Sequence, residues 1–172
     1  MLFTFVNIVP DLWFLLLGAE AVSAPPAATS TPENVQPLCP LSLSGTSHRH
    51  CVFTIPEELS VFFRKDRSLL NLLFKAAADA IFFMFKKLNK SENFTPGFIC
   101  VLHTFGRSLQ WNPHIHMLIS EGASGNFSVW RVVKHFHYEL LRKSFRLTLL
   151  NYLEEHIGKS FKKVKSYIYK HC

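Results

Sequence analysis

The first 48 positions of this 172-residue chain contain no lysine or arginine. All 19 basic residues lie in residues 49–172 together with nine of the twelve acidic ones, which gives this part a formal net charge of +10. Residues 1–48 carry only three charges, all acidic. A strongly basic segment favours an anionic partner, and nucleic acid is the commonest of these. Charge alone leaves one alternative open, a soluble basic protein that binds no polyanion.

Cysteine is scarce and irregularly spaced. The four cysteines, Cys39, Cys51, Cys100 and Cys172, form no CxxC pair, so the sequence does not encode a zinc ribbon. Cys51 and Cys100 lie within apolar runs, which is typical of buried thiols in a reducing compartment. We therefore expect a cytoplasmic protein.

Residues 1–48 also lack what a secretory signal or a membrane span requires. Their apolar run has no basic residues before it, contains Asp11 and is interrupted by Pro10. Residues 25–46 hold five of the nine prolines, a composition typical of an unstructured linker. We expect residues 1–48 to be an apolar, proline-rich leader outside the working domain of residues 49–172, and we expect no membrane partner.

From His50 onward the hydrophobic pattern becomes regular. It predicts strands over 50–56, 97–106 and 112–119, helices over 56–65, 69–90 and 129–157, and a last amphipathic piece over 160–170. Gly158 should end the third helix. This order predicts an α+β fold, with an antiparallel sheet and helices packed on one face.

Two apolar stripes are expected to face the core. In the helix over 69–90 the stripe consists of Leu69, Leu73, Ala76, Ala80 and Phe83. In the helix over 129–157 it consists of Val129, Val132, Val133, Phe136, Leu140 and Leu141. The basic residues of that second helix lie mostly off the stripe, where they form either a solvated face or a surface that contacts phosphates.

The segment WNPHIHMLI, residues 111–119, carries two histidines one residue apart. Side chains alternate along a strand, so His114 and His116 should point to the same face. If the turn before this strand centres near residues 107–110, His103 lies across from them, and one register would bring three imidazoles together. Such a cluster is typical of a metal site, and ordinary strand histidines are the alternative.

The segments HCVFTIPEEL, ENFTPGFICVLHTFGRSLQWNPHIHMLI and VWRVVKHFHYELLRKSFR closely resemble insertion-sequence transposases of the rolling-circle, two-tyrosine type. These transposases belong to the HUH endonuclease superfamily, which is named for a His–hydrophobic–His motif. The resemblance covers about residues 49–172. It implies an HUH-nuclease fold with a ferredoxin-like palm, here incomplete.

The resemblance also implies a chemistry. His114 and His116 match the HUH pair, and His103 falls where a third metal ligand is expected. In such enzymes Mg²⁺ or Mn²⁺ polarises the scissile phosphate of single-stranded DNA at the element ends, and a tyrosine attacks the phosphorus to give a 5′-phosphotyrosine. The DNA contacts that we expect are Arg107, Arg131, Lys134, Arg142, Lys143 and Arg146.

This chain departs from the family in two places. Relatives carry a cysteine-rich zinc module before the first strand, and they place two tyrosines a few residues apart on a later helix. The tyrosines of this chain, Tyr138, Tyr152, Tyr167 and Tyr169, lack that helical spacing. We therefore expect a truncated transposase that keeps the metal-binding palm, without nucleophilic tyrosines.

Two other functions stay open. One is a DNA-binding remnant without catalysis, which would bind metal but not nick DNA. The other is an unrelated small metalloprotein that uses the HxH pair. Met117 and Leu118 follow the pair, so the chain lacks the HxHxDH continuation of metallo-β-lactamase-type enzymes.

Overall fold

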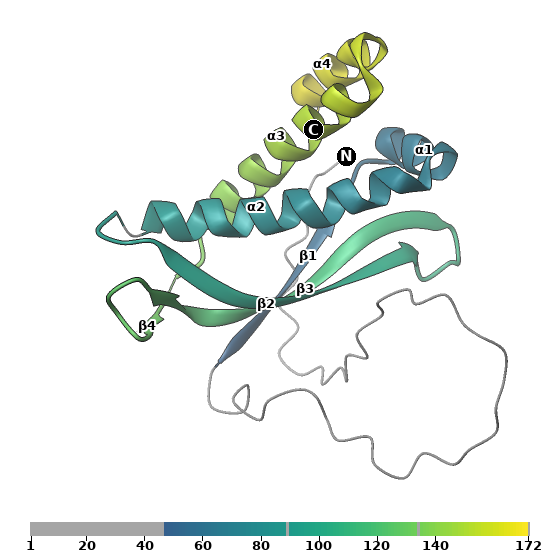
Figure 1. Cartoon of the computed structure of the whole chain (residues 1–172). Coiled ribbons are helices and arrows are strands. Elements are labelled where there is room, and N and C mark those ends of the chain that lie inside the picture. Colours follow the sequence, from purple (N-terminus) through teal and green to yellow (C-terminus); the bar gives the residue numbers. More distant parts are fainter. Residues whose placement is uncertain (1–46, 89, 134, 172) are drawn as a thin grey trace, which may run out of the picture.

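A computed structural model describes residues 47–88, 90–133 and 135–171 (Figure 1). Within these ranges a twisted sheet forms one layer, and a group of helices forms a second layer on one of its faces (Figure 1). The fold class expected from the sequence is confirmed. Apart from its last two residues, the expected leader of residues 1–48 lies outside the described residues, so its boundary stays a prediction.

The sheet is antiparallel, and its long strands follow the order β1-β3-β2. Strand β1 spans His48–Thr54, β2 spans Phe94–Phe105 and β3 spans Trp111–Gly125. A two-residue strand, β4 (Arg131–Val132), pairs with the far end of β3. Strand β3 therefore lies in the centre, and its side chains have neighbours on both sides.

Within the described residues, four α-helices lie on one side of this sheet (Figure 1). They are α1 (Glu57–Lys65), α2 (Leu70–Leu88), α3 (Tyr138–Ile157) and α4 (Lys162–His171), and α4 packs against α3 rather than on the strands. Short 3-10 turns at Arg67–Leu69 and Lys159–Phe161 precede α2 and α4. Gly158 ends α3 with a φ of 85°, a backbone conformation that glycine adopts at little cost.

The core lies between the helices and one face of the sheet. Alternate residues of the strands, among them Phe53, Ile115 and Met117, are buried against this layer. Helix α2 contributes Leu73 and Met84, also fully buried. The remaining strand residues, which include the histidines, therefore point to the opposite face.

The segment Arg67–Leu88, which includes α2, is long and apolar enough to span a membrane by length and composition, with a mean hydropathy of 1.6. Its alanines Ala76, Ala77 and Ala80 are completely buried inside the domain. The composition of α2 is thus that of a core helix, and it does not indicate a membrane span.

The structure corrects two sequence predictions about the helices. Phe83 is 40% exposed, and the neighbouring residues Met84 and Phe85 are buried in its place. The four other residues of the expected α2 stripe are buried as predicted. The stripe therefore drifts by about one residue along the helix, as 3.6 residues per turn requires over several turns.

The second correction concerns residues 129–137, which were predicted to be helical. Arg131 and Val132 form β4, and α3 begins only at Tyr138. The Glu92 side chain accepts hydrogen bonds from the Phe127 amide (2.8 Å) and from Ser128 Oγ (2.5 Å). This carboxylate holds the chain in a turn after β3, so the backbone pairs with the strand rather than entering a helix.

The stripe predicted for residues 129–141 is correspondingly broken. Val129 and Val132 are 91% and 61% exposed, whereas Phe136 and Leu141 are completely buried. His137 precedes α3 and accepts a hydrogen bond from the Leu140 amide (3.2 Å), so it acts as the N-cap of the helix. The helix-like spacing of apolar residues therefore begins before the turn that precedes α3, and the spacing alone does not reveal that turn.

Candidate metal centre

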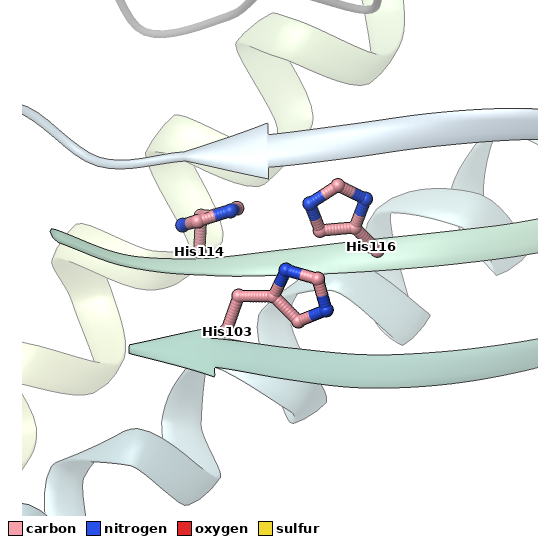
Figure 2. A group of neighbouring side chains, drawn as sticks. All are labelled: His103, His114 and His116. Atoms are coloured by element: carbon pink, nitrogen blue, oxygen red, sulfur yellow. The ribbon is translucent and has the colours of Figure 1, made fainter. Parts of the chain in front are cut away.

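Three histidines meet on the sheet face that points away from the helices. His103 on β2 pairs directly with His114 on β3, and His116 lies two residues further along β3 (Figure 2). The ring centroid of His103 lies 5.3 Å from the ring centroid of His114 and 4.2 Å from that of His116. One ring nitrogen of each histidine lies within 4.8 Å of the other two. The register expected from the sequence is thus confirmed.

The antiparallel ladder explains why these side chains converge. Directly paired residues project to the same face, and residues two apart along a strand share that face. The alternating residues Ile115 and Met117 are fully buried in the core. His114 and His116 are half-buried, and His103 is exposed. The HxH spacing therefore presents both imidazoles to the side that solvent reaches.

His114 has a fixed proton arrangement. Its Nδ1 lies 2.7 Å from the backbone oxygen of Asn112. A carbonyl oxygen only accepts hydrogen bonds, so Nδ1 of His114 must carry the proton. The Nε2 atom of the neutral ring then keeps its lone pair. This arrangement, in which a backbone acceptor orients the ring, is common among histidines that bind metals.

A fourth histidine, His50 on β1, adjoins the cluster from the other side. Its Nε2 lies 2.9 Å from Nδ1 of His116, and the planes of the two rings are 23° apart with centroids 5.0 Å apart. Sequence reasoning alone did not assign His50 to the site. The alternation of β1 was visible, but only the register with β3, in which Val52 pairs with His116, brings His50 to the cluster.

The environment of His116, His50 and His103 favours the neutral form of their rings. Burial, and then the neighbouring rings of His103, His114 and His50, lower the pKa of His116 to about 4. Burial is also the main cause that lowers the pKa of His50 and of His103. A histidine binds metal through an unprotonated nitrogen, so rings that stay neutral near pH 7 are ready to act as ligands.

The donor set fits a divalent metal ion. A metal–imidazole bond is about 2.1 Å long, so two nitrogens on one ion lie no more than roughly 4.2 Å apart. The ring nitrogens of His103, His114 and His116 lie within 4.8 Å of one another, and small rotations of the side chains would bring them to one ion. The cluster can therefore hold a metal ion, with the solvent side open for further ligands.

The basic residues predicted to contact DNA do not lie together. Arg107 is exposed in the turn between β2 and β3, four residues after His103. Arg131 lies at the other end of the sheet on β4, with its guanidinium over the Phe94 ring at 5.1 Å. Lys134 lies outside the described residues. Among the predicted DNA-contact residues that the structure describes, Arg107 lies at the same end of the β2–β3 hairpin as the histidines.

The other three predicted DNA contacts are on α3, in the helix layer. Arg142 and Lys143 are exposed, and Lys143 forms an ion pair with Glu139 at 2.6 Å. Arg146 is half-buried and lies over the Tyr169 ring at 4.8 Å. The sheet separates α3 from the face that carries the histidines, so these three residues and the cluster belong to different layers of the domain (Figure 1).

All four tyrosines also belong to the helix layer. Tyr138 accepts a hydrogen bond from Nη1 of Arg49 (2.6 Å), and Tyr152 donates one to Asp79 on α2. Tyr167 and Tyr169 lie on α4 and are about half exposed. Each phenol is thus carried by a helix on the face opposite the histidines.

Comparison with known proteins identifies relatives of this chain. Residues 97–171 match a family model described as "Putative transposase". The transposase for insertion sequence element IS801 of Pseudomonas savastanoi pv. phaseolicola is 35% identical over 105 residues, which cover 61% of this chain and 24% of the relative. "Putative transposase y4qJ" of Sinorhizobium fredii (strain NBRC 101917 / NGR234) is 30% identical over 118 residues, or 66% of this chain and 29% of the relative.

This chain thus spans about a quarter of the length of the curated relatives that it matches. The matched residues include the hairpin of β2 and β3 with all three histidines of the cluster. Sequence, fold and histidine geometry agree in supporting, for the matched part of the chain, a similarity to two-tyrosine (Y2) rolling-circle transposases of insertion sequences.

Proposed function

We propose that residues 49–172 are the metal-binding part of a transposase that holds single-stranded DNA at the ends of a mobile element. The observation that carries this proposal is the cluster of His103, His114 and His116 on the open face of the sheet. The names of the relatives, which are transposases, support DNA as the partner. The free cysteines Cys51 and Cys100 are consistent with a cytoplasmic location.

The ion that we propose is Mn²⁺ or Mg²⁺. An all-imidazole donor set favours Mn²⁺ over Mg²⁺, because Mg²⁺ prefers oxygen ligands and keeps much of its water. When bound, the ion would polarise a phosphate oxygen of the DNA. The protein's own contribution is to hold three imidazole rings on one rigid sheet face, with Nδ1 of His114 engaged by its backbone acceptor.

The positions of the tyrosines favour binding without strand cleavage by this chain. A phenol that attacks the phosphorus must lie within a few ångströms of the phosphate at the metal. The four phenols are carried by α3 and α4, across the sheet from the histidines. We therefore propose that this chain binds the metal and the DNA strand, and that its four tyrosines do not act as nucleophiles.

The proposal is tested by calorimetry with Mn²⁺ on the full chain. The double substitution His114→Ala and His116→Ala should abolish measurable binding, because two of three ligands are lost. The chain offers a matched control in another HxH pair, His135 and His137, whose rings lie 6.5 Å apart. His135→Ala combined with His137→Asn, which keeps a capping side chain, should bind Mn²⁺ like the wild type. Equal affinity in the wild type and the first double variant would refute the metal site.

A further inference from the structure

His50 contacts one member of the cluster and is not itself within the group of three. The group whose ligand atoms lie within 4.8 Å of one another consists of His103, His114 and His116. Within the described part of the chain His50 forms a hydrogen bond with His116, at 2.9 Å between Nε2 of His50 and Nδ1 of His116. Both side chains are half-buried, on neighbouring strands β1 and β3.

Two imidazole nitrogens at this distance require one proton between them. If Nε2 of His50 carried it, Nδ1 of His116 would accept, and the neutral His116 ring would carry its own proton on Nε2. That nitrogen would then have no lone pair for a metal. If Nδ1 of His116 carries the proton, its Nε2 is free to bind. The direction of this one hydrogen bond therefore decides whether His116 is a ligand.

In His114 the tautomer is fixed because Nδ1 donates its proton to the Asn112 carbonyl, which can only accept. On His116 the corresponding atom, Nδ1, faces a side chain instead. We infer that His50 is a positioning residue of the metal centre: it accepts the Nδ1 proton of His116 and so holds the Nε2 lone pair of His116 toward the ion. This inference rests on the proposed metal site and adds to it a residue on a third strand.

Contact between the rings gives His50 a second way to orient His116. The planes of the two rings are 23° apart and the centroid distance is 5.0 Å, so the rings meet edge to edge through the hydrogen bond. A phenylalanine at position 50 would keep an aromatic ring beside His116 but would remove the acceptor. A glutamine would restore an acceptor oxygen without the ring. These two substitutions separate the hydrogen bond from the packing.

The test measures Mn²⁺ affinity by calorimetry on the full chain, with folding checked by circular dichroism. Loss of the hydrogen-bond partner of a metal-binding histidine lowers metal affinity about 10- to 100-fold. We expect at least a tenfold rise in Kd for His50→Phe and a Kd within a few-fold of the wild type for His50→Gln. His48→Phe is the matched control, since His48 lies on the same strand and face, two residues from His50, and pairs with Ser120. Its Kd should not change.

A second readout needs no metal. Nitrogen-15 NMR of the His116 ring should show the proton on Nδ1 in the wild type and in His50→Gln, and a shift toward Nε2 in His50→Phe. Electron spin-echo spectroscopy of bound Mn²⁺ should show the same number of coupled imidazoles in the wild type and in His50→Phe. A loss of one imidazole would mean that His50 is a ligand, and the positioning role would be wrong.

The outcomes separate the inference from the proposed function. A wild type that binds Mn²⁺ and a folded His50→Phe that binds it equally well would overturn the role of His50 and leave the metal site intact. A wild type that does not bind Mn²⁺ would overturn both. An unchanged Kd in His50→Phe together with an unchanged His116 proton position would show that another group orients the ring.

Discussion

His103 on β2 lies directly opposite His114 on β3, in a register that continues through Val101 and His116. This pairing makes His103 a member of the cluster, although 11 residues separate it from His114 in the sequence. A change of one residue in the register would turn His103 to the helix side. The hairpin thus determines the donor set as strongly as the HxH motif does.

The first prediction follows from that pairing. Replacing His103 with alanine should weaken Mn²⁺ binding at least tenfold without unfolding the protein, because the side chain is exposed and its loss removes one of three ligands. His135→Ala, which removes another exposed histidine outside the cluster, is the control. Titration of Mn²⁺ by calorimetry measures both variants. If His103→Ala bound Mn²⁺ like the wild type, the third ligand would have to be another group.

The second prediction distinguishes the two sides of the domain as DNA surfaces. Arg107 lies in the turn next to the histidines, whereas Arg142 is on α3 in the opposite layer. Each phosphate contact contributes about 0.7 to the slope of log affinity against log salt for single-stranded DNA. Arg107→Ala should reduce that slope by about this amount, and Arg142→Ala should leave it unchanged. Fluorescence anisotropy with a labelled oligonucleotide at several salt concentrations gives the slopes. The reverse result would place the DNA on the helix side.

The third prediction concerns the buried face of α2, for which helix periodicity wrongly predicts Phe83 as a core residue. Met84 is completely buried, whereas Phe83 is 40% exposed. Met84→Ala should lower the free energy of unfolding by about 2–5 kcal/mol, as truncations of buried side chains do. Phe83→Ala should change it by less than about 1 kcal/mol. Urea unfolding followed by circular dichroism measures both. A larger effect at Phe83 would mean that α2 is rotated from the orientation described.

The strands and the histidine cluster could be predicted from the sequence because their signals are local or short in range. The alternation around Ile115 and Met117 shows which face carries the histidines, and a turn between residues 106 and 110 limits the register of His103. The contribution of His50 depends on pairing between β1 and β3, which are more than 50 residues apart. Nothing in the local pattern of β1 fixes which residue of β3 it meets.

The start of α3 was mispredicted for a similar reason. The segment after Ser128 has helix-like spacing, but the Glu92 carboxylate, more than 30 residues earlier, binds the turn at Phe127 and Ser128. A tertiary hydrogen bond therefore overrides the local periodicity. For the same reason the sequence does not show on which side of the sheet Arg142 lies. The pattern of a helix indicates which of its faces is apolar, but not against which layer of the domain the helix packs.

The fourth prediction concerns the hydrogen bond between Tyr152 and Asp79, which joins α3 to α2. This bond, then burial, and then nearby carboxylates raise the pKa of Tyr152 to about 12. An unperturbed tyrosine has a pKa near 10. Since the pKa is higher in the folded state, the stabilisation is fully present below about pH 10 and is lost as the pH rises from 10 to 12.

Tyr152→Phe should therefore lower the free energy of unfolding by about 1 kcal/mol at pH 8, and by less at pH 11. Urea unfolding at the two pH values gives the difference. Tyr167→Phe is the control, because Tyr167 is half exposed on α4. An equal effect of Tyr152→Phe at both pH values would show that the phenol contributes through packing rather than through its proton.

The last prediction is that this chain binds single-stranded DNA without forming a covalent adduct. Binding depends on phosphate neutralisation, and residues 49–172 keep a net charge of +10. Cleavage needs a positioned nucleophile, and the phenols lie on the helices across the sheet from the histidines. The Tyr152 hydroxyl is in addition engaged with Asp79, which disfavours its ionised form. We therefore expect the histidine cluster to bind Mn²⁺ and the strand while no phenol reaches the phosphorus.

The measurement uses single-stranded oligonucleotides from the ends of a related insertion sequence, incubated with the full chain and Mn²⁺. Binding should appear as a salt-dependent shift in anisotropy, and a denaturing gel should show intact DNA with no protein attached. His114→Ala combined with His116→Ala should leave the gel unchanged. An adduct that disappears on a single Tyr→Phe substitution would contradict the prediction and identify the nucleophile. In that case the helix that carries this tyrosine would have to leave its position in the helix layer to reach the histidine face.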